Sequence, residues 1–339
     1  MLSHFDFNNL GPIEKIQGKN LQNINLIIGA NSSGKTFLLK ALYAAIRAHE
    51  ETGRGDEPRD FSDVLGQKLY WTYQTEKLGD LVTRGAQKRF SGSLSLDDNS
   101  ALAFGFGQDT TLKVAVHHNN LQKREANSIF LPPKEVLGLN KVIVKTTIQD
   151  KTFGFDATYS DLVIALQGAI PRGRPMESFT KSTNMLEKMF QGTVEPTQDG
   201  DGWIYKKGNS RFSINITAEG VKKISILTTL LRNKYLSPSS IIFIDEPESA
   251  LHPTAITQLM DIILILAKQG IQFFIATHSY FVIKKLHLIA RQEGIQIPLL
   301  SPDENNDWAQ QSLEDGMPAT PIIEESVRLF QEELELLRK

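Results

Sequence analysis

The sequence is informative first for what it lacks. Its 339 residues include no cysteine, which excludes disulfides and thiolate metal sites and fits a reducing compartment. The net charge of −2 gives no overall sign of nucleic-acid binding, although a local basic patch would be compatible with it. The apolar runs are too short to span a bilayer, and the N-terminus lacks a signal-peptide pattern. We therefore expect a cytoplasmic protein with no membrane segment.

What is present favours an α/β fold. Hydrophobic residues make up 40% of the chain and charged residues 22%, which is typical of a globular protein with a substantial core. Short apolar runs alternate with helical patterns, and this alternation predicts a mostly parallel core sheet with helices on it. The strands between 89 and 116 predict an added antiparallel sheet, and a helical stretch interrupted at Pro171 and Pro175 predicts a helical insert. The expected strands are 25–28, 90–96, 102–106, 112–116, 128–131, 241–244, 272–276 and a hairpin of 203–205 with 211–214; the expected helices are 37–48, 61–88, 157–192, 218–232, 254–269 and 321–339.

A glycine-rich loop carries the first chemical signal. The chain reads G-A-N-S-S-G-K-T over residues 29–36, between an expected strand and an expected helix. Glycines at these positions let backbone N–H groups turn inward around phosphate oxygens, and the start of the helix adds its positive end. Lys35 can reach the β- and γ-phosphates, and the Thr36 hydroxyl can bind Mg²⁺. The pattern predicts an ATP and magnesium site that includes Asn31, Ser32, Ser33, Gly34, Lys35 and Thr36.

Two later apolar runs end in polar side chains. The run 241–244 ends at Asp245 and Glu246; an aspartate at this place completes the magnesium shell, and the next glutamate can polarise a water for attack on the γ-phosphate. The run 273–276 leads to His278, which can hydrogen-bond the γ-phosphate or that water and so sense the phosphate. We expect Lys35, Glu246 and His278 to carry ATP hydrolysis, and Thr36 and Asp245 to bind the metal.

The order and spacing of these motifs resemble those of ABC-type ATPase heads of the SMC-like and OLD-like branch. The run I-D-E-P-E-S-A-L-H-P at 244–253 looks like the Walker B motif and D-loop of that branch, A-T-H-S at 276–279 like its His switch, and N-S-S-G-K at 31–35 like its P-loop variant. The resemblance covers most of the chain, from Phe5 to about Phe281. It implies a P-loop NTPase fold of the ABC-ATPase type. We assign 1–150 and 196–339 to a discontinuous nucleotide-binding domain and 151–195 to a helical insert lobe.

An ABC head also needs a signature loop, which completes the ATP site of the opposite subunit. Residues 217–220 read T-A-E-G before an expected helix, where relatives often carry Ser-Glu-Gly. Ala218 stands in place of the serine, so Thr217 is the candidate hydroxyl, and the Gly220 N–H is the candidate for approach to the γ-phosphate. The resemblance implies a head-to-tail homodimer around two ATP molecules, which closes on binding and opens on hydrolysis. In it Thr217, Glu219, Gly220 and residues 248–250 would contact the ATP of the opposite subunit.

The glutamine loop of ABC heads has no direct counterpart. The corresponding corner reads F-L-P-P-K-E-V over 130–136 and contains no glutamine. Either Lys134 or Glu135 substitutes for it, or the segment is a plain strand-to-helix corner.

Three roles suit such an ATPase, and the choice rests on family analogy. The first is a regulatory or sensor ATPase of a prokaryotic antiviral system that acts with a separate effector, a nuclease or toxin. Similar compact ATPases occur beside retron-, Septu- and TOPRIM-type effectors. We expect the effector to be separate because the residues after His278 leave no room for a second catalytic domain. The second is an SMC-like DNA-repair or chromosome-maintenance clamp, but 157–192 is short and lacks the sustained heptads of coiled-coil arms. The third, a transporter ATPase, would need a signature closer to Leu-Ser-Gly-Gly-Gln. We favour the first role and keep the SMC-like clamp as the alternative.

Overall fold

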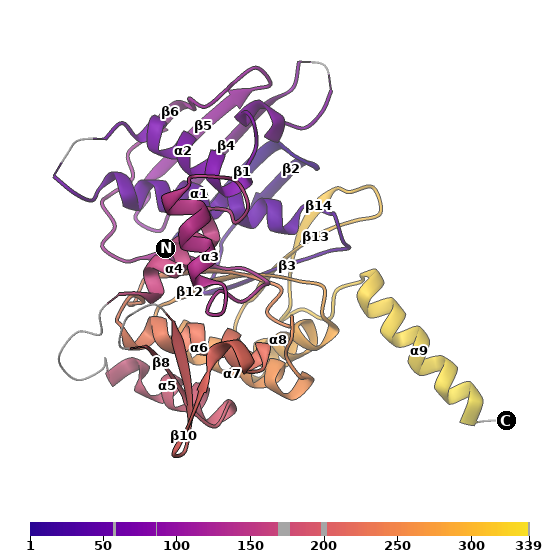
Figure 1. Ribbon diagram of the computed structural model, residues 1–339. Helices are drawn as coiled ribbons and strands as arrows, with labels where there is room; N and C mark the ends of the chain where they lie inside the picture. The colour runs from indigo at the N-terminus through magenta and orange to yellow at the C-terminus, as the bar shows by residue number, and fades with distance from the viewer. Residues whose placement is uncertain (57–58, 86, 169–176, 198–201, 338–339) are drawn as a thin grey trace.

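A six-stranded sheet runs through the middle of the molecule. The computed structural model describes residues 1–56, 59–85, 87–168, 177–197 and 202–337. The sheet has the strand order β14-β13-β3-β12-β11-β7 (Figure 1). Neighbours from β13 to β7 pair in parallel, and β14 pairs antiparallel at one edge. The predicted mostly parallel core sheet is therefore confirmed. Its strands are β3 (Ile24–Ile28), β7 (Ser128–Leu131), β11 (Ile241–Asp245), β12 (Gln272–Thr277), β13 (Pro298–Pro302) and β14 (Trp308–Ser312).

Two antiparallel sheets flank this core. A five-stranded sheet of order β2-β1-β4-β5-β6 lies at one end of the molecule and a three-stranded sheet of order β10-β9-β8 at the other (Figure 1). The first confirms the predicted added sheet, and the pairing of Tyr205 with Phe212 confirms the predicted hairpin. The strands are β1 (Leu2–Leu10), β2 (Ile13–Gly18), β4 (Arg89–Leu96), β5 (Ala101–Gly107), β6 (Ala115–Asn119), β8 (Thr193–Pro196), β9 (Trp203–Lys207) and β10 (Ser210–Ser213).

Both faces of the core sheet are covered around β3, β11 and β12, which explains why these three strands are largely apolar. Phe243 and Phe274 point into one buried cluster with α1 and the five-stranded sheet, whereas Ile242 and Phe273 point into the other with α6, α7 and α8. The helices are α1 (Lys35–Thr52), α2 (Phe61–Tyr73), α3 (Asn140–Ile143), α4 (Ala157–Leu166), α5 (Glu177–Met189), α6 (Glu219–Arg232), α7 (Pro253–Lys268), α8 (Tyr280–Glu293) and α9 (Pro321–Leu337), with single turns η1 (Leu78–Leu81), η2 (Val144–Gln149) and η3 (Ile214–Ile216).

Some predicted elements are wrong in extent. The predicted helix over 61–88 ends at Tyr73, because Gln74 adopts a left-handed backbone with φ of 51°. The predicted strand 112–116 lies at Ala115–Asn119 instead. The predicted strand 128–131 is confirmed as β7, which pairs with β11 at the edge of the core sheet. The elements α8, β13 and β14 were not foreseen.

The helical insert is built into the main core. Pro171 and Pro175 lie outside the described residues, between α4 and α5. Leu162 of α4 and Phe179 of α5 belong to the same buried cluster as Ile242 of the core sheet. The domain division at 151 and 195 stays a prediction. None of the helices in the described ranges combines the length and apolar character that crossing a bilayer requires.

Candidate functional site

The P-loop connects β3 to α1 with a backbone that only certain residues allow. Gly34 has φ of 101°, and a Cβ there would lie 2.8 Å from Ile13 Cγ1. A Cβ on Gly29 would lie 2.6 Å from Ser33 Oγ. Gly34 also precedes the first helical residue without a side-chain cap, so the first N–H groups of α1 are available to a ligand. The loop therefore has the geometry of a phosphate site, and Asn31 and Ser32 lie on its exposed side.

The Lys35 side chain points back toward the start of this loop. Its Nζ donates hydrogen bonds to the carbonyl oxygens of Gly29 and Ala30, both at 2.8 Å. Burial lowers the pKa of Lys35, while Asp245 and Glu246 act in the opposite direction. A phosphate placed in the loop would supply the negative charge that these carbonyl oxygens provide only in part.

Asp245 and Thr36 meet at the end of β11. The Thr36 hydroxyl donates to Asp245 Oδ2 at 2.8 Å. Asp245 Oδ1 is buried and has no hydrogen-bond partner among the described residues, and the same holds for Ser33 Oγ. Burial raises the pKa of Asp245. An unpartnered carboxylate oxygen beside a hydroxyl is a donor set that fits Mg²⁺ with phosphate and water completing the shell. In the described ranges, no group of three or more His, Cys, Asp or Glu side chains is arranged to hold a metal ion. Mg²⁺ at Asp245 would therefore need further ligands from phosphate and water.

Glu246 and His278 stand side by side on adjacent strand ends. Glu246 has a left-handed backbone with φ of 49°, and its N–H donates to the Ala276 carbonyl at 2.9 Å. His278 Nδ1 lies 3.5 Å from Glu246 Oε1, and the Glu246 side chain is 36% exposed. The turn out of β11 thus aims the carboxylate at the histidine while leaving it open to water.

Glu248 of the predicted D-loop is engaged within its own chain. Its Oε1 accepts a hydrogen bond from the Thr277 hydroxyl at 2.7 Å and from the His278 N–H at 3.2 Å. Its Oε2 is buried and unpartnered among the described residues. These contacts join the D-loop to the strand that carries His278, a link that sequence spacing does not reveal.

The predicted signature loop starts α6 and packs against the same D-loop. Ala218 is the N-cap of α6 and makes no capping hydrogen bond. The Thr217 hydroxyl donates to the Ser213 carbonyl at 3.1 Å, and Glu219 pairs with Lys222 at 2.6 Å. A Cβ on Gly220 would lie 3.0 Å from the Ala250 carbonyl oxygen. The absence of a side chain at Gly220 therefore lets the two loops approach closely.

The candidate glutamine-loop residues differ in their contacts. Glu135 accepts from the Gly138 N–H at 2.9 Å and lies 3.5 Å from Lys222, whereas Lys134 is exposed. Both line a pocket of about 380 Å³ together with residues that begin α6 and with the D-loop. The two loops that the resemblance assigns to the opposite subunit's ATP thus share one pocket with the 132–135 corner.

Sequence reasoning missed Lys223. From the second turn of α6 its Nζ donates to the Glu246 carbonyl at 2.5 Å and lies 3.5 Å from the Pro133 carbonyl. Burial lowers its pKa to about 8, although Glu248 and Glu246 favour the charged form. Lys223 therefore links α6 to the turn at Glu246. The one hint in the sequence is a lysine pair, 222–223, near the start of this helix.

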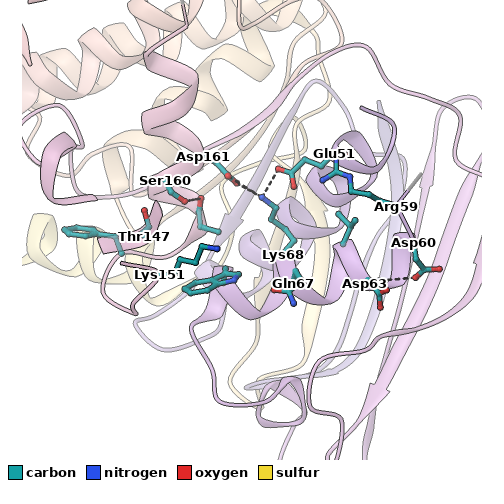
Figure 2. Close-up of a pocket in the computed structure, with 14 residues that line it drawn as sticks. Glu51, Arg59, Asp60, Asp63, Gln67, Lys68, Thr147, Lys151, Ser160 and Asp161 are labelled. Atoms are coloured by element: carbon teal, nitrogen blue, oxygen red, sulfur yellow. Dashed lines mark hydrogen bonds and ion pairs between the residues drawn. The ribbon is translucent and has the colours of Figure 1, made fainter. Parts of the chain in front are cut away.

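A separate pocket of about 580 Å³ lies beside the far end of α1 (Figure 2). None of residues 29–36 lines it, so its volume is not that of the nucleotide site. Lys68 on its wall pairs with Asp161 at 3.0 Å and with Glu51 at 2.7 Å. Burial opposes the charge of Lys68, but Asp161 and Glu51 outweigh it and raise its pKa. The pocket thus has a fixed ion pair in its wall.

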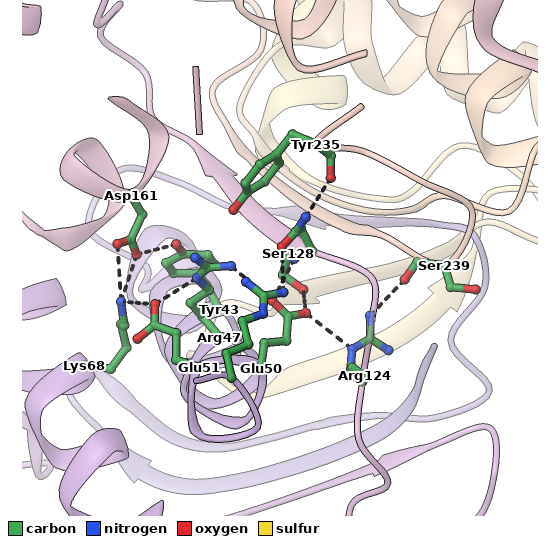
Figure 3. A network of polar contacts seen from close by, with 12 residues as sticks. Tyr43, Arg47, Glu50, Glu51, Lys68, Arg124, Ser128, Asp161, Tyr235 and Ser239 are labelled. Atoms are coloured by element: carbon green, nitrogen blue, oxygen red, sulfur yellow. Dashed lines mark hydrogen bonds and ion pairs between the residues drawn. The ribbon is translucent and has the colours of Figure 1, made fainter. Parts of the chain in front are cut away.

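This ion pair belongs to a larger polar network that includes side chains from the second half of α1 (Figure 3). Tyr43 donates to Asp161 at 2.6 Å, and Arg47 donates to Glu51 at 2.9 Å. The fully buried Glu50 accepts from the Ser128 N–H at 2.9 Å and from its hydroxyl at 2.7 Å. The network therefore ties α1, which starts at the P-loop, to β7, which leads into the corner at 132–135.

The fold is the α/β fold seen in SMC heads, and the predicted motifs lie at one edge of its core sheet. The P-loop, Asp245 and His278 follow β3, β11 and β12, which are neighbours in one parallel sheet, and ligand sites lie at such carboxyl ends.

Comparisons with known proteins agree on this fold. An SMC head bound to the C-winged helix domain of ScpA matches with a TM-score of 0.58 and 13% identity, over 93% of this chain and 98% of that chain. An SMC head with an extended coiled coil, bound to the C-terminal domain of ScpA derived from Pyrococcus furiosus, matches with a TM-score of 0.51 and 11% identity, over 100% and 99%. A family model described as "AAA domain, putative AbiEii toxin, Type IV TA system" matches residues 206–284. The curated proteins searched gave no match.

Proposed function

We propose that this chain binds ATP with Mg²⁺ and hydrolyses it, that two copies close head-to-tail around two ATP molecules, and that this cycle regulates a separate effector in prokaryotic antiviral defence. The observation that carries the ATPase proposal is the meeting of Thr36, Asp245, Glu246 and His278 at one sheet edge. An orphaned Asp245 oxygen beside the Thr36 hydroxyl supports the metal. A pocket shared by the 132–135 corner, α6 and the D-loop supports a partner surface.

Each residue has a role in the proposed reaction. The α1 N–H groups and Lys35 hold the phosphates, with Lys35 exchanging its carbonyl partners for phosphate oxygens. Thr36 and Asp245 would hold Mg²⁺, which neutralises charge on the phosphate oxygens when bound. Glu246 orients the attacking water and accepts its proton. His278 lies within 3.6 Å of Glu246 and Glu248, so it couples the presence of the γ-phosphate to the D-loop.

The defence role draws on the matched family model. The matched family model carries a toxin–antitoxin description, which fits a chain that regulates a toxin or nuclease. The SMC-like clamp remains the second candidate, because two SMC heads share the fold. Against it, α4 and α5 have 10 and 13 residues, far short of the long helices that coiled-coil arms need.

The Glu246→Gln variant tests the mechanism. It keeps the shape and the hydrogen-bonding capacity of the side chain but removes the base, so ATP should stay bound and the dimer should stay closed. We expect light scattering to report a dimer with ATP and Mg²⁺ and a monomer without them. The exposed Glu76 provides a matched control, Glu76→Gln, which should behave as the unchanged chain.

Two results would overturn the proposal. One is a Glu246→Gln chain that hydrolyses ATP at the normal rate; the other is a chain that stays monomeric under all nucleotide conditions. For the two roles, turnover stimulated by DNA alone would favour the clamp. Turnover or dimerisation altered by a co-expressed nuclease or toxin from a neighbouring gene would favour defence. A nuclease assay on the chain alone should be negative.

A further inference from the structure

The last helix leaves the body of the protein. In Figure 1 α9 extends away from the sheets and from α8, toward the C-terminal end of the chain. Every residue of α9 is exposed or partly exposed, and near its start Ile322 and Ile323 pack against the main core. At about 1.5 Å per residue its 17 residues span roughly 25 Å. A helix in this position is held at one end and offers most of its surface to another molecule.

That surface has a broad apolar side, which we call the α9 apolar face: Val327, Leu329, Phe330, Leu334, Leu336 and Leu337. Val327, Phe330, Leu334 and Leu337 repeat at intervals of three, four and three, the spacing of a coiled-coil seam. Leu329 and Leu336 form a second line, seven residues apart, on the neighbouring part of the helix. The six side chains are between 38% and 77% exposed. Isolated exposed apolar residues are ordinary, but six on one side of a single helix mark an interaction site.

The charge of α9 indicates what covers this face. Residues 321–337 contain five glutamates and one arginine. Arg328 is already paired with Glu325 and Glu332, which leaves Glu324, Glu333 and Glu335 without a cation partner within residues 321–337. At about 100° per residue, Glu333 falls between the two apolar lines. A surface that covers the face must therefore bring a basic group into its middle.

Two other occupants fit less well. An anionic bilayer attracts helices whose polar side is rich in Lys and Arg, and α9 has the opposite charge. A second α9 would bring five more glutamates against these, and one helix covers a single seam, which would leave Leu329 and Leu336 in water. A wider surface is required than one helix provides.

We propose that α9 is a docking helix for a separate protein that presents an apolar groove carrying lysine or arginine. The binding mode is that of an amphipathic helix in a groove, with anchors at positions i, i+3 and i+7 of the seam. The inference takes from the proposed function only the existence of a separate partner, and it requires neither ATP hydrolysis nor ATP-driven dimerisation.

The test uses two matched double variants of the full chain. Phe330→Ser/Leu334→Ser removes two anchors from the α9 apolar face. Arg328→Ser/Glu332→Ser introduces the same two serines at the same spacing on the polar side and leaves the net charge unchanged. The probes are the proteins encoded by the two reading frames that flank the gene, each purified and titrated into the chain by calorimetry.

We expect one flanking protein to bind the unchanged chain and the control variant with similar affinity. The loss of two anchor side chains should weaken binding about 100-fold. Binding should also weaken with added salt, since basic groups of the groove face the glutamates. Helicity and ATP binding should be the same in both variants, because α9 contributes no fully buried side chain to the described core.

Four outcomes would overturn the proposal: neither flanking protein binds; both double variants bind equally well; the chain without nucleotide doubles its mass through the apolar face; or it binds vesicles of phosphatidylglycerol and phosphatidylcholine through that face. The proposed function fails separately. A Glu246→Gln chain that does not dimerise with ATP but still binds its partner through α9 refutes the ATPase mechanism alone.

Discussion

Replacing Lys223 with methionine is expected to stabilise the protein at pH 7 and to slow ATP turnover. Burial lowers the pKa of this lysine from 10.5 to about 8, and each pH unit corresponds to about 1.4 kcal/mol, so keeping it charged in the folded state costs roughly 3 kcal/mol. Methionine removes that cost but leaves the Glu246 carbonyl without its hydrogen-bond donor. The lost hydrogen bond lowers the free energy of unfolding by about 1–2 kcal/mol. The net gain should be about 1–2 kcal/mol.

The sign of the pH dependence follows from the same lowering of the Lys223 pKa. Between pH 8 and pH 10.5 the unfolded chain keeps the Lys223 proton while the folded chain releases it, so the stability of the unchanged protein rises with pH there. The stability advantage of Lys223→Met should therefore shrink by roughly 3 kcal/mol from pH 7 to pH 10.5. Urea unfolding of both proteins at several pH values measures this difference directly.

The neighbouring lysine provides the control. Against the cost of burial, Glu219 and Glu135 raise the pKa of Lys222, so its charge stabilises the fold below its unfolded pKa, and the contribution is lost only as pH rises through the folded pKa. Lys222→Met should accordingly destabilise the protein at pH 7. A stability difference for Lys223→Met that stays flat from pH 7 to pH 10.5, or equal effects of the two substitutions, would refute the reasoning.

Three further substitutions test other parts of the structure. Ala218→Ser should add a capping hydrogen bond at the start of α6 and raise the free energy of unfolding by about 1 kcal/mol, which thermal unfolding can detect; no gain would mean that the loop is not free to cap. Gly34→Ala forces a φ of 101° on alanine and a contact of 2.8 Å with Ile13, so calorimetry should find ATP binding lost; normal affinity would contradict the assigned loop geometry. Lys68→Met leaves Asp161 buried beside Tyr43 and should cost about 3–5 kcal/mol in urea unfolding; a loss below 1 kcal/mol would show that the network adds little.

The core strands were predictable because their environment is uniform. Each of β3, β11 and β12 is buried on both faces, so each appears in the sequence as a short, largely apolar run; β11 and β12 end in a polar residue, and β3 leads into Gly29. β13 is equally buried, but Pro298 and Pro302 bound it and conceal it. The end of α2 depends on the backbone of Gln74, a residue that ordinarily continues a helix.

The site was predictable to the same extent. Lys35, Thr36, Asp245, Glu246 and His278 lie at fixed positions after strands, and a spacing pattern records such positions. The Lys223 contact with Glu246 and the Glu248 contact with Thr277 depend on how helix and loop pack in three dimensions. A sequence pattern contains no direct record of such packing, so these residues emerged only from the structure.

The charged network behind α1 also limits how that helix can move. A slide by one turn would displace its residues by about 5.4 Å, and it would separate Glu50 from Ser128 and Tyr43 from Asp161 in the dry interior, where an unpaired charge is very costly. Small rotations that carry β7 along keep every pair intact. If ATP binding shifts the Lys35 end of α1, then α1 and β7 should move together as one rigid unit. The shift would therefore reach the 132–135 corner without repacking of the side chains between α1 and β7.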